Sequence, residues 1–130
     1  MSDKKILVVY GSLRNGFGNN RLLRNSEHLS TETISIQYRM ISLGGFPGLI
    51  PSEENHDIVV EVWSVDKDTY RNVEYLEGWP SFYQKAVVNT SVGEGEVYVL
   101  ESKRYQSGYD AVESGDWNEF YKRRFYEEAI

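Results

Sequence analysis

Cysteine is absent from this 130-residue chain, and histidine occurs only twice. Without thiols the chain forms no disulfide, no thiolate metal site and no cysteine nucleophile. His28 and His56 have no partner at a ligand spacing, so we expect no metal site. A Ser-His-Asp hydrolase built on Ser12 is also disfavoured, because the nucleophile-elbow sequence is missing around that serine.

Long basic runs and long apolar runs are missing as well. The net charge is −6, and no basic run is longer than Lys122-Arg123-Arg124. We therefore expect no nucleic-acid partner and no binding to anionic membranes. The apolar run at residues 6–10 is too short for a signal-peptide core or a membrane span. These features favour a cytoplasmic protein with a small-molecule partner.

Aromatic residues, by contrast, are abundant: ten Tyr, five Phe and three Trp. They predict an aromatic core or a pocket with aromatic walls. The length suits one domain over residues 1–130. Strand-like patterns outnumber short helical ones, which predicts an α+β fold rather than a repeated β-α-β sheet.

The elements are bounded by turn and capping residues. Helices are expected from Asn19 and Asn20 to about His28, from Asp66 or Asp68 to about Leu76, and over 118–128 with Asp116 as N-cap. Strands are expected over 6–10, 33–41, 58–65, 82–90 and 96–100, with a hairpin over 91–95. Residues 44–48 contain three glycines and a proline, which predict a loop.

The first strand leads into a glycine-containing loop, Tyr10-Gly11-Ser12-Leu13-Arg14-Asn15-Gly16. Consecutive backbone N–H groups in such a turn can bind an anion or stabilise an oxyanion. A nucleotide P-loop fits poorly, because Phe17-Gly18 stands where Lys-Ser or Lys-Thr is needed. A dinucleotide fingerprint lacks its third glycine. Arg14 is expected at the surface or as a brace of this loop.

A second feature is the carboxylate of Glu77, within Leu76-Glu77-Gly78-Trp79-Pro80. It is expected at the end of a helix that Gly78 stops. Apolar and aromatic neighbours raise a carboxyl pKa by desolvation, which makes such a group suitable as a proton shuttle. The alternative is a solvent-facing carboxylate at the helix end, a position that the helix dipole disfavours.

Both features resemble signatures of the γ-glutamylcyclotransferase-like family, which includes the γ-glutamylamine cyclotransferases and the AIG2-like proteins. The loop at 10–16, with Asn19 and two leucines behind it, resembles the opening motif. The second signature is matched by Glu77-Gly78, Pro80 and Tyr83. Segments 45–48, 62–63, 96–99 and 115–117 follow the family pattern in order, so the resemblance spans roughly residues 6–120.

This resemblance implies a small mixed β-barrel or strongly curved sheet flanked by short helices. It implies cofactor-independent γ-glutamyl cyclotransfer, in which a γ-glutamyl amine or peptide releases 5-oxoproline and a free amine. Glu77 is then the general acid/base, and Tyr10, Gly11, Ser12, Leu13 and Tyr83 bind the substrate. The chain departs from the family at Glu74, usually aspartate, and at Lys85, usually arginine. These departures affect substrate choice, since lysine lacks the bidentate contacts of arginine.

Other interpretations stay open at this stage. The pocket can belong to a non-catalytic binding module for a γ-glutamyl or other carboxylate ligand. The aromatic-rich stretch from Tyr105 to Tyr126 can serve a partner-binding domain. Tyr10, Tyr83 and Tyr98 can be packing residues of strands. An amino acid, a peptide-bound lysine, a polyamine and an aminoglycoside side chain all fit as leaving group, and the negative net charge favours a cationic one through steering.

Overall fold

The computed structural model describes residues 4–101 and 109–129, with side chains up to residue 123. The elements in order are β1 (Lys5–Val9), the 3-10 helix η1 (Gly18–Leu23), β2 (Glu27–Ser42), β3 (Pro47–Val65), α1 (Lys67–Glu77), β4 (Tyr83–Thr90), β5 (Gly93–Leu100), β6 (Asp110–Ala111) and α2 (Trp117–Ala129). Part of the stretch from Tyr105 to Tyr126, which the partner-binding interpretation concerns, lies outside the described residues.

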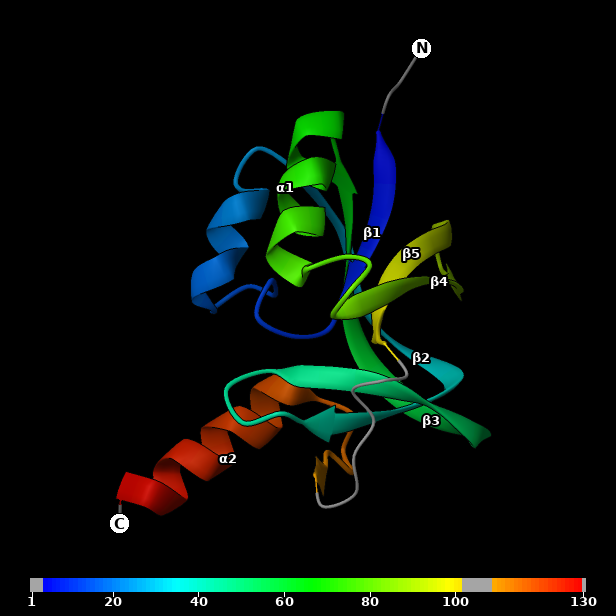
Figure 1. Ribbon diagram of the computed structural model, residues 1–130. Coiled ribbons are helices and arrows are strands. Elements are labelled where there is room, and N and C mark those ends of the chain that lie inside the picture. The colour runs from blue at the N-terminus through cyan, green and yellow to red at the C-terminus, as the bar shows by residue number, and fades with distance from the viewer. Residues whose placement is uncertain (1–3, 102–108, 130) are drawn as a thin grey trace.

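The strands form one curled sheet in the order β4-β5-β1-β3-β2-β6. Neighbours pair antiparallel except β1 and β5, which are parallel. The β2–β3 hairpin has register shifts between His28 and Ser30 and between Ile36 and Tyr38. Such irregularities bend strands, and Figure 1 shows β3 turning sharply along its length. The predicted α+β fold with a strongly curved sheet and short helices is thus confirmed.

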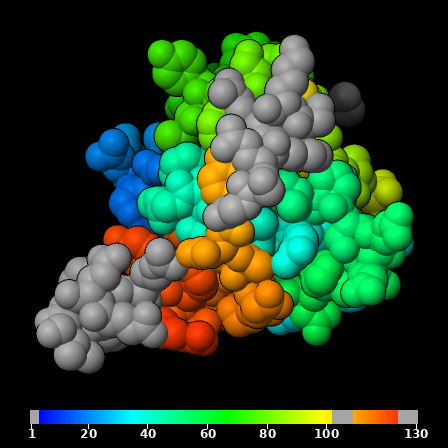
Figure 2. Space-filling model, turned by 60° about the horizontal axis from the view of Figure 1, so that its bottom comes forward, coloured from blue at the N-terminus to red at the C-terminus, as the bar shows by residue number. Residues whose placement is uncertain are grey.

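The sheet is buried on both faces, as the alternation along β1 shows. Leu7 and Val9 pack in one cluster with Tyr70 and Val73 of α1. Val8 packs in the other cluster, together with Trp117 of α2. Segment 109–116 lies beside α2 and against the β2–β3 hairpin (Figure 2). No helix among the described residues is both long and apolar enough to cross a membrane.

Helix α1 forms where capping residues predict it. The Asp66 side chain accepts a hydrogen bond of 2.8 Å from the Thr69 N–H and caps the first turn. At the other end, Gly78 adopts a left-handed conformation with φ of 66°. A residue with a Cβ is disfavoured there, which explains why the helix ends directly after Glu77.

Several predicted boundaries of helices, strands and loops are wrong. The helix predicted to reach His28 ends at Leu23, and β2 begins at Glu27. The His28 ring stacks on Trp63 of β3, with centroids 4.8 Å apart, which stabilises extended structure there. The loop predicted at 44–48 ends earlier, because Pro47 starts β3, where its missing N–H is tolerated. The hairpin turn predicted over 91–95 shortens to Ser91 and Val92, since Gly93 already pairs with Thr90.

Candidate active site

A cavity of about 490 Å³ lies between the loop after β1 and the C-terminal end of α1. The loop passes beneath that helix end in Figure 1. All six residues predicted for the site line this cavity: Tyr10, Gly11, Ser12, Leu13, Glu77 and Tyr83. Folding therefore brings together two motifs that are more than sixty residues apart in the sequence.

The close approach of Pro47 explains the glycine at position 11. A Cβ added to Gly11 would lie 2.8 Å from the Pro47 ring, which is too short for a carbon–carbon contact. Glycine is the residue that lets a backbone come this near a neighbour. Segment 45–48, which contains Pro47, thus packs directly against the loop after β1. It also forms part of the cavity wall.

Side chains hold the loop in a fixed shape. The Asn19 amide donates to the Ser12 hydroxyl over 2.9 Å, and the Asn20 amide donates to the Leu13 carbonyl over 2.7 Å. The backbone N–H groups of Ser12 and Leu13 donate to no acceptor among the described residues. Two preorganised donors at a cavity wall can receive a carboxylate or an oxyanion.

Arg14 is buried, with 5% of its surface exposed, so its predicted surface position is wrong and the bracing role is right. Its guanidinium lies 3.3 Å from the Glu61 carboxylate and 2.9 Å from the Asp116 carboxylate. Glu61 also accepts from the Asn15 backbone N–H and from the Trp63 indole. This buried network attaches the loop to β3 and to the start of α2.

Glu77 is the one carboxylate in the described cavity wall. Burial raises its pKa from 4.5 to about 7, because the charged form is desolvated there. Within the described residues it forms no hydrogen bond or ion pair. A carboxyl group with a pKa near neutrality exists in both protonation states at neutral pH, which general acid/base catalysis requires.

Three buried tyrosines surround this carboxyl group. Tyr10 donates to the Tyr98 carbonyl and Tyr83 to the Pro47 carbonyl, each over 2.7 Å. The Tyr98 hydroxyl is buried with no partner among the described residues. Burial raises the pKa of all three, and the nearby Glu77 charge raises it further. They therefore stay neutral at neutral pH.

Sequence reasoning did not select Tyr98 as a site residue, although it lines the cavity. The last four residues of β5 are all buried. The pattern of apolar and polar residues therefore did not indicate which of their side chains line a cavity. It also missed the cavity-lining role of Asn19, Phe46, Leu76 and Phe82.

The two departures from the family pattern form a pair. Lys85 of β4 makes an ion pair with Glu74, one turn before Glu77 on α1. The Lys85 ammonium also lies 4.0 Å from the centre of the Trp79 ring and 4.7 Å from that of Tyr70. The pair ties the end of α1 to β4, and so it fixes the distance between Glu77 and the strand that carries Tyr83.

The raised pKa of Glu77 predicts a pH-dependent effect of Glu77→Gln on stability. The Glu77 carboxyl group binds its proton more tightly in the folded chain than in the unfolded chain. As the pH rises from 4.5 to about 7, the group loses this proton, and the charged carboxylate then destabilises the fold. At about pH 8, glutamine is expected to stabilise the fold by about 3 kcal/mol, since the pKa shift is about 2.5 units at 1.36 kcal/mol each. Near pH 4.5 the gain is expected to be small.

Chemical denaturation at both pH values measures this difference. Glu53→Gln, on the exposed part of β3, is the matched control and is expected to show no such pH-dependent gain. An equal change in unfolding free energy for Glu77→Gln at both pH values would show that the pKa is not raised.

The arrangement combines a carboxyl group of near-neutral pKa and two unpaired backbone donors in one cavity. Among the described residues no cluster of three or more His, Asp or Glu side chains is placed to hold a metal ion. The groups present suit proton transfer to and from nitrogen, together with stabilisation of an oxyanion.

Comparison with known proteins gives a consistent result. The sequence model of the family described as γ-glutamyl cyclotransferase, AIG2-like, matches residues 7–119. The γ-glutamylcyclotransferase family protein YtfP of Escherichia coli is 32% identical over 111 residues, covering 85% of this chain and 94% of that protein. Its solution structure superposes with a TM-score of 0.69.

Two further known proteins are less similar in sequence. The γ-glutamylaminecyclotransferase of Rattus norvegicus is 28% identical over 102 residues, covering 69% of this chain and 66% of that protein. The crystal structure of PH0828 from Pyrococcus horikoshii has a TM-score of 0.78 at 22% identity, covering 94% of this chain and 97% of that one. At that identity the likeness concerns the fold.

Proposed function

The chain belongs to the γ-glutamyl cyclotransferase, AIG2-like, family, and we propose that it converts a γ-glutamyl amine or peptide into 5-oxoproline and a free amine. The observation that carries this proposal is the partly buried carboxyl group of Glu77, which has no partner among the described residues and a pKa raised to about 7, in the same cavity as the Ser12 and Leu13 backbone donors. We further propose that residues 1–130 act as one domain.

The reaction is an intramolecular aminolysis. The Glu77 carboxylate takes a proton from the α-ammonium group of the substrate, and the resulting amine attacks the γ-carbonyl carbon. A new C–N bond closes the five-membered ring, and the carbonyl oxygen gains negative charge. The Ser12 and Leu13 N–H groups are proposed to stabilise that charge or to hold the α-carboxylate.

Collapse of the intermediate breaks the original C–N bond. Glu77 passes protons to the leaving nitrogen one at a time, so two of the three ammonium protons end on the free amine. No water is consumed. Because nucleophile and electrophile belong to one molecule, holding them in the reactive geometry supplies much of the acceleration, with effective molarities of about 10⁵ M or more.

The roles of the remaining residues follow from their positions. Tyr10 and Tyr83 line the cavity beside Glu77 and are proposed to contact the γ-glutamyl group, along with the Gly11 backbone. Tyr98 contributes to the same cavity wall. A purely anion-binding module would gain nothing from a carboxylate at this position, since it repels the ligand that the loop attracts.

The proposal is tested by incubating the protein with γ-glutamyl dipeptides and γ-glutamyl alkylamides. Mass spectrometry should detect 5-oxoproline and free amine in equal amounts from at least one of them. Absence of release from every substrate, by a protein shown to be folded by circular dichroism, would reject the proposed activity.

A further inference from the structure

The cavity has a buried floor and an exposed mouth, and the two differ in chemistry. Tyr10, Tyr83 and Tyr98 are all under 10% exposed and form the floor with Glu77. Phe46 and Leu76, which also line the cavity, are 39% and 40% exposed and therefore lie at the mouth. A γ-glutamyl group bound on the floor directs the rest of its amide toward this mouth.

The mouth is apolar. The Phe46 ring lies 5.9 Å from the Phe82 ring, centroid to centroid, and both line the cavity beside Leu76. Phe46 and Leu76 belong to the small set of large hydrophobic side chains exposed on the described surface. Apolar side chains exposed at the opening of a pocket indicate contact with an apolar part of a ligand.

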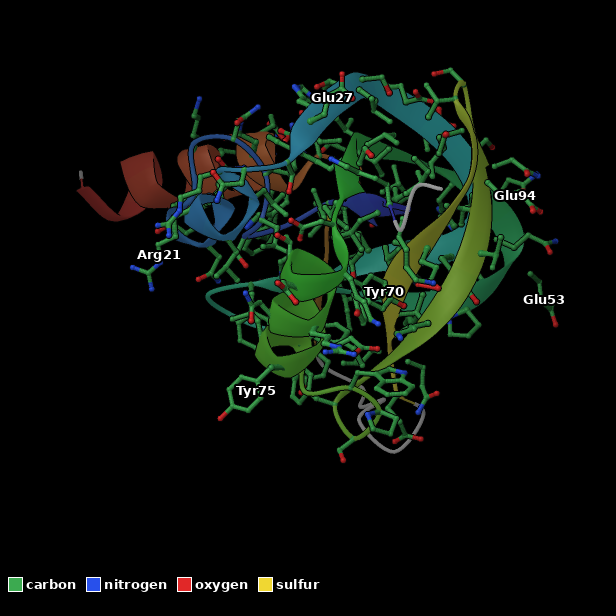
Figure 3. All side chains as sticks on the ribbon, turned by 90° about the horizontal axis from the view of Figure 1, so that it is seen from above. Arg21, Glu27, Glu53, Tyr70, Tyr75 and Glu94 are labelled. Atoms are coloured by element: carbon green, nitrogen blue, oxygen red, sulfur yellow. The ribbon has the colours of Figure 1, made fainter. Side chains whose placement is uncertain are left out.

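A second hollow of about 410 Å³ adjoins the mouth, because Asn19 and Leu76 line both. Arg21, Asn72 and Tyr75 complete its wall with Leu22. Tyr75 is 90% exposed, and Figure 3 shows Tyr75 and Arg21 both projecting outward from the side of the molecule that holds α1 and η1. The mouth thus continues into a surface groove whose charged residue is a cation.

A second positive charge on the substrate would find no unoccupied carboxylate among the described residues there. Among the described residues lining the two hollows, Glu77 is the one acid, and the α-amino group of the substrate already engages it. Arg21 would repel an ammonium group. The rings of Trp79 and Tyr70 are already covered by the Lys85 ammonium, so they offer no further cation–π contact on that face.

We propose that the mouth formed by Phe46, Leu76 and Phe82 is the subsite for the leaving amine, and that it selects amines with an apolar substituent over those with a second ammonium group. The inference rests on the proposed cyclotransfer. Long-range steering by the net charge of −6 would favour a cationic leaving amine. We expect the opposite preference, because short-range contacts in the subsite decide the affinity.

A matched pair of substrates tests the inference. γ-Glutamyl-n-pentylamide and γ-glutamyl-5-aminopentylamide share one carbon chain and differ at its end by an ammonium group. We expect kcat/KM for 5-oxoproline release to be at least about tenfold higher for the pentylamide, the range expected when a hydrophobic pocket gains or loses apolar contact.

Two variants test whether the residues of the subsite cause this substrate preference. Phe46→Ala is expected to lower kcat/KM for the pentylamide about fivefold through KM, with a smaller change for the aminopentylamide. Arg21→Glu is expected to raise kcat/KM for the aminopentylamide severalfold. Val92→Ala is the matched control, because Val92 is an equally exposed apolar residue in the β4–β5 turn, and it should leave both values unchanged.

The outcomes separate the two proposals. Equal use of both substrates, or a preference for the aminopentylamide, would overturn the inference while the cyclotransfer stands. Unchanged selectivity in both Phe46→Ala and Arg21→Glu would also overturn it. Release of 5-oxoproline from a γ-glutamyl dipeptide but from neither amide would overturn the inference while the cyclotransfer stands. Release from no γ-glutamyl substrate would reject both.

Discussion

Glu77→Gln is expected to lower kcat for 5-oxoproline release by about 10²–10⁴-fold, the usual contribution of general acid–base catalysis. Glutamine has nearly the shape of glutamate but cannot accept the ammonium proton or return it to the leaving nitrogen. The cavity offers no substitute, since Glu77 is the one acid among its described lining residues. The loss is expected in kcat, with KM changed only severalfold.

Steady-state kinetics of the wild type and Glu77→Gln measure this effect. Glu53→Gln is the matched control, because Figure 3 shows Glu53 on the far side of the molecule from α1. It is expected to retain wild-type activity. A Glu77→Gln protein that is folded and keeps more than about a tenth of the wild-type kcat would show that another group moves the protons.

Arg14→Met is expected to destabilise the fold by about 3–5 kcal/mol, the range for removing one partner of a buried ion pair. The substitution leaves the buried Glu61 carboxylate without its cation, while Asp116 loses a contact of 2.9 Å. The effect is expected to include loss of activity, because this network holds the loop that presents the Ser12 and Leu13 donors.

Denaturant unfolding of Arg14→Met against Arg39→Met tests the expectation. Arg39 faces Glu113 across 3.9 Å at the surface, where both side chains are well exposed. Exposed pairs contribute about 0–1 kcal/mol. Adding Glu61→Gln to Arg14→Met should recover part of the lost stability by removing the stranded charge. Equal losses in the two single variants would mean that the buried network does not stabilise the loop.

Local signals in the sequence predicted the parts of the site that depend on near neighbours. Asp66 and Gly78 bound α1 through interactions within a few residues, so the position of Glu77 at the helix end followed from capping rules. The loop after β1 followed in the same way from an apolar run that ends at a glycine. The family motifs then indicated that these two regions meet.

Local sequence patterns could not predict contacts between residues that are far apart in the chain. Arg14 meets Glu61 and Asp116, which lie 47 and 102 residues further along the chain, so nothing near Arg14 marks it as buried. The Glu74–Lys85 pair joins a helix to a strand. The length of β3 was underestimated because residues 51–57, which separate its buried start from the apolar run at 58–65, are mostly exposed and polar.

The central claim, intramolecular aminolysis in the Glu77 cavity, is tested most directly by turnover of a γ-glutamyl alkylamide in ¹⁸O-labelled water, followed by mass spectrometry of the products. Cyclotransfer predicts unlabelled 5-oxoproline in a one-to-one ratio with the free amine, because the ring carbonyl keeps its original oxygen. Formation of ¹⁸O-labelled glutamate would contradict the account, since it would show that water, and not the substrate's own amine, attacks the γ-carbonyl.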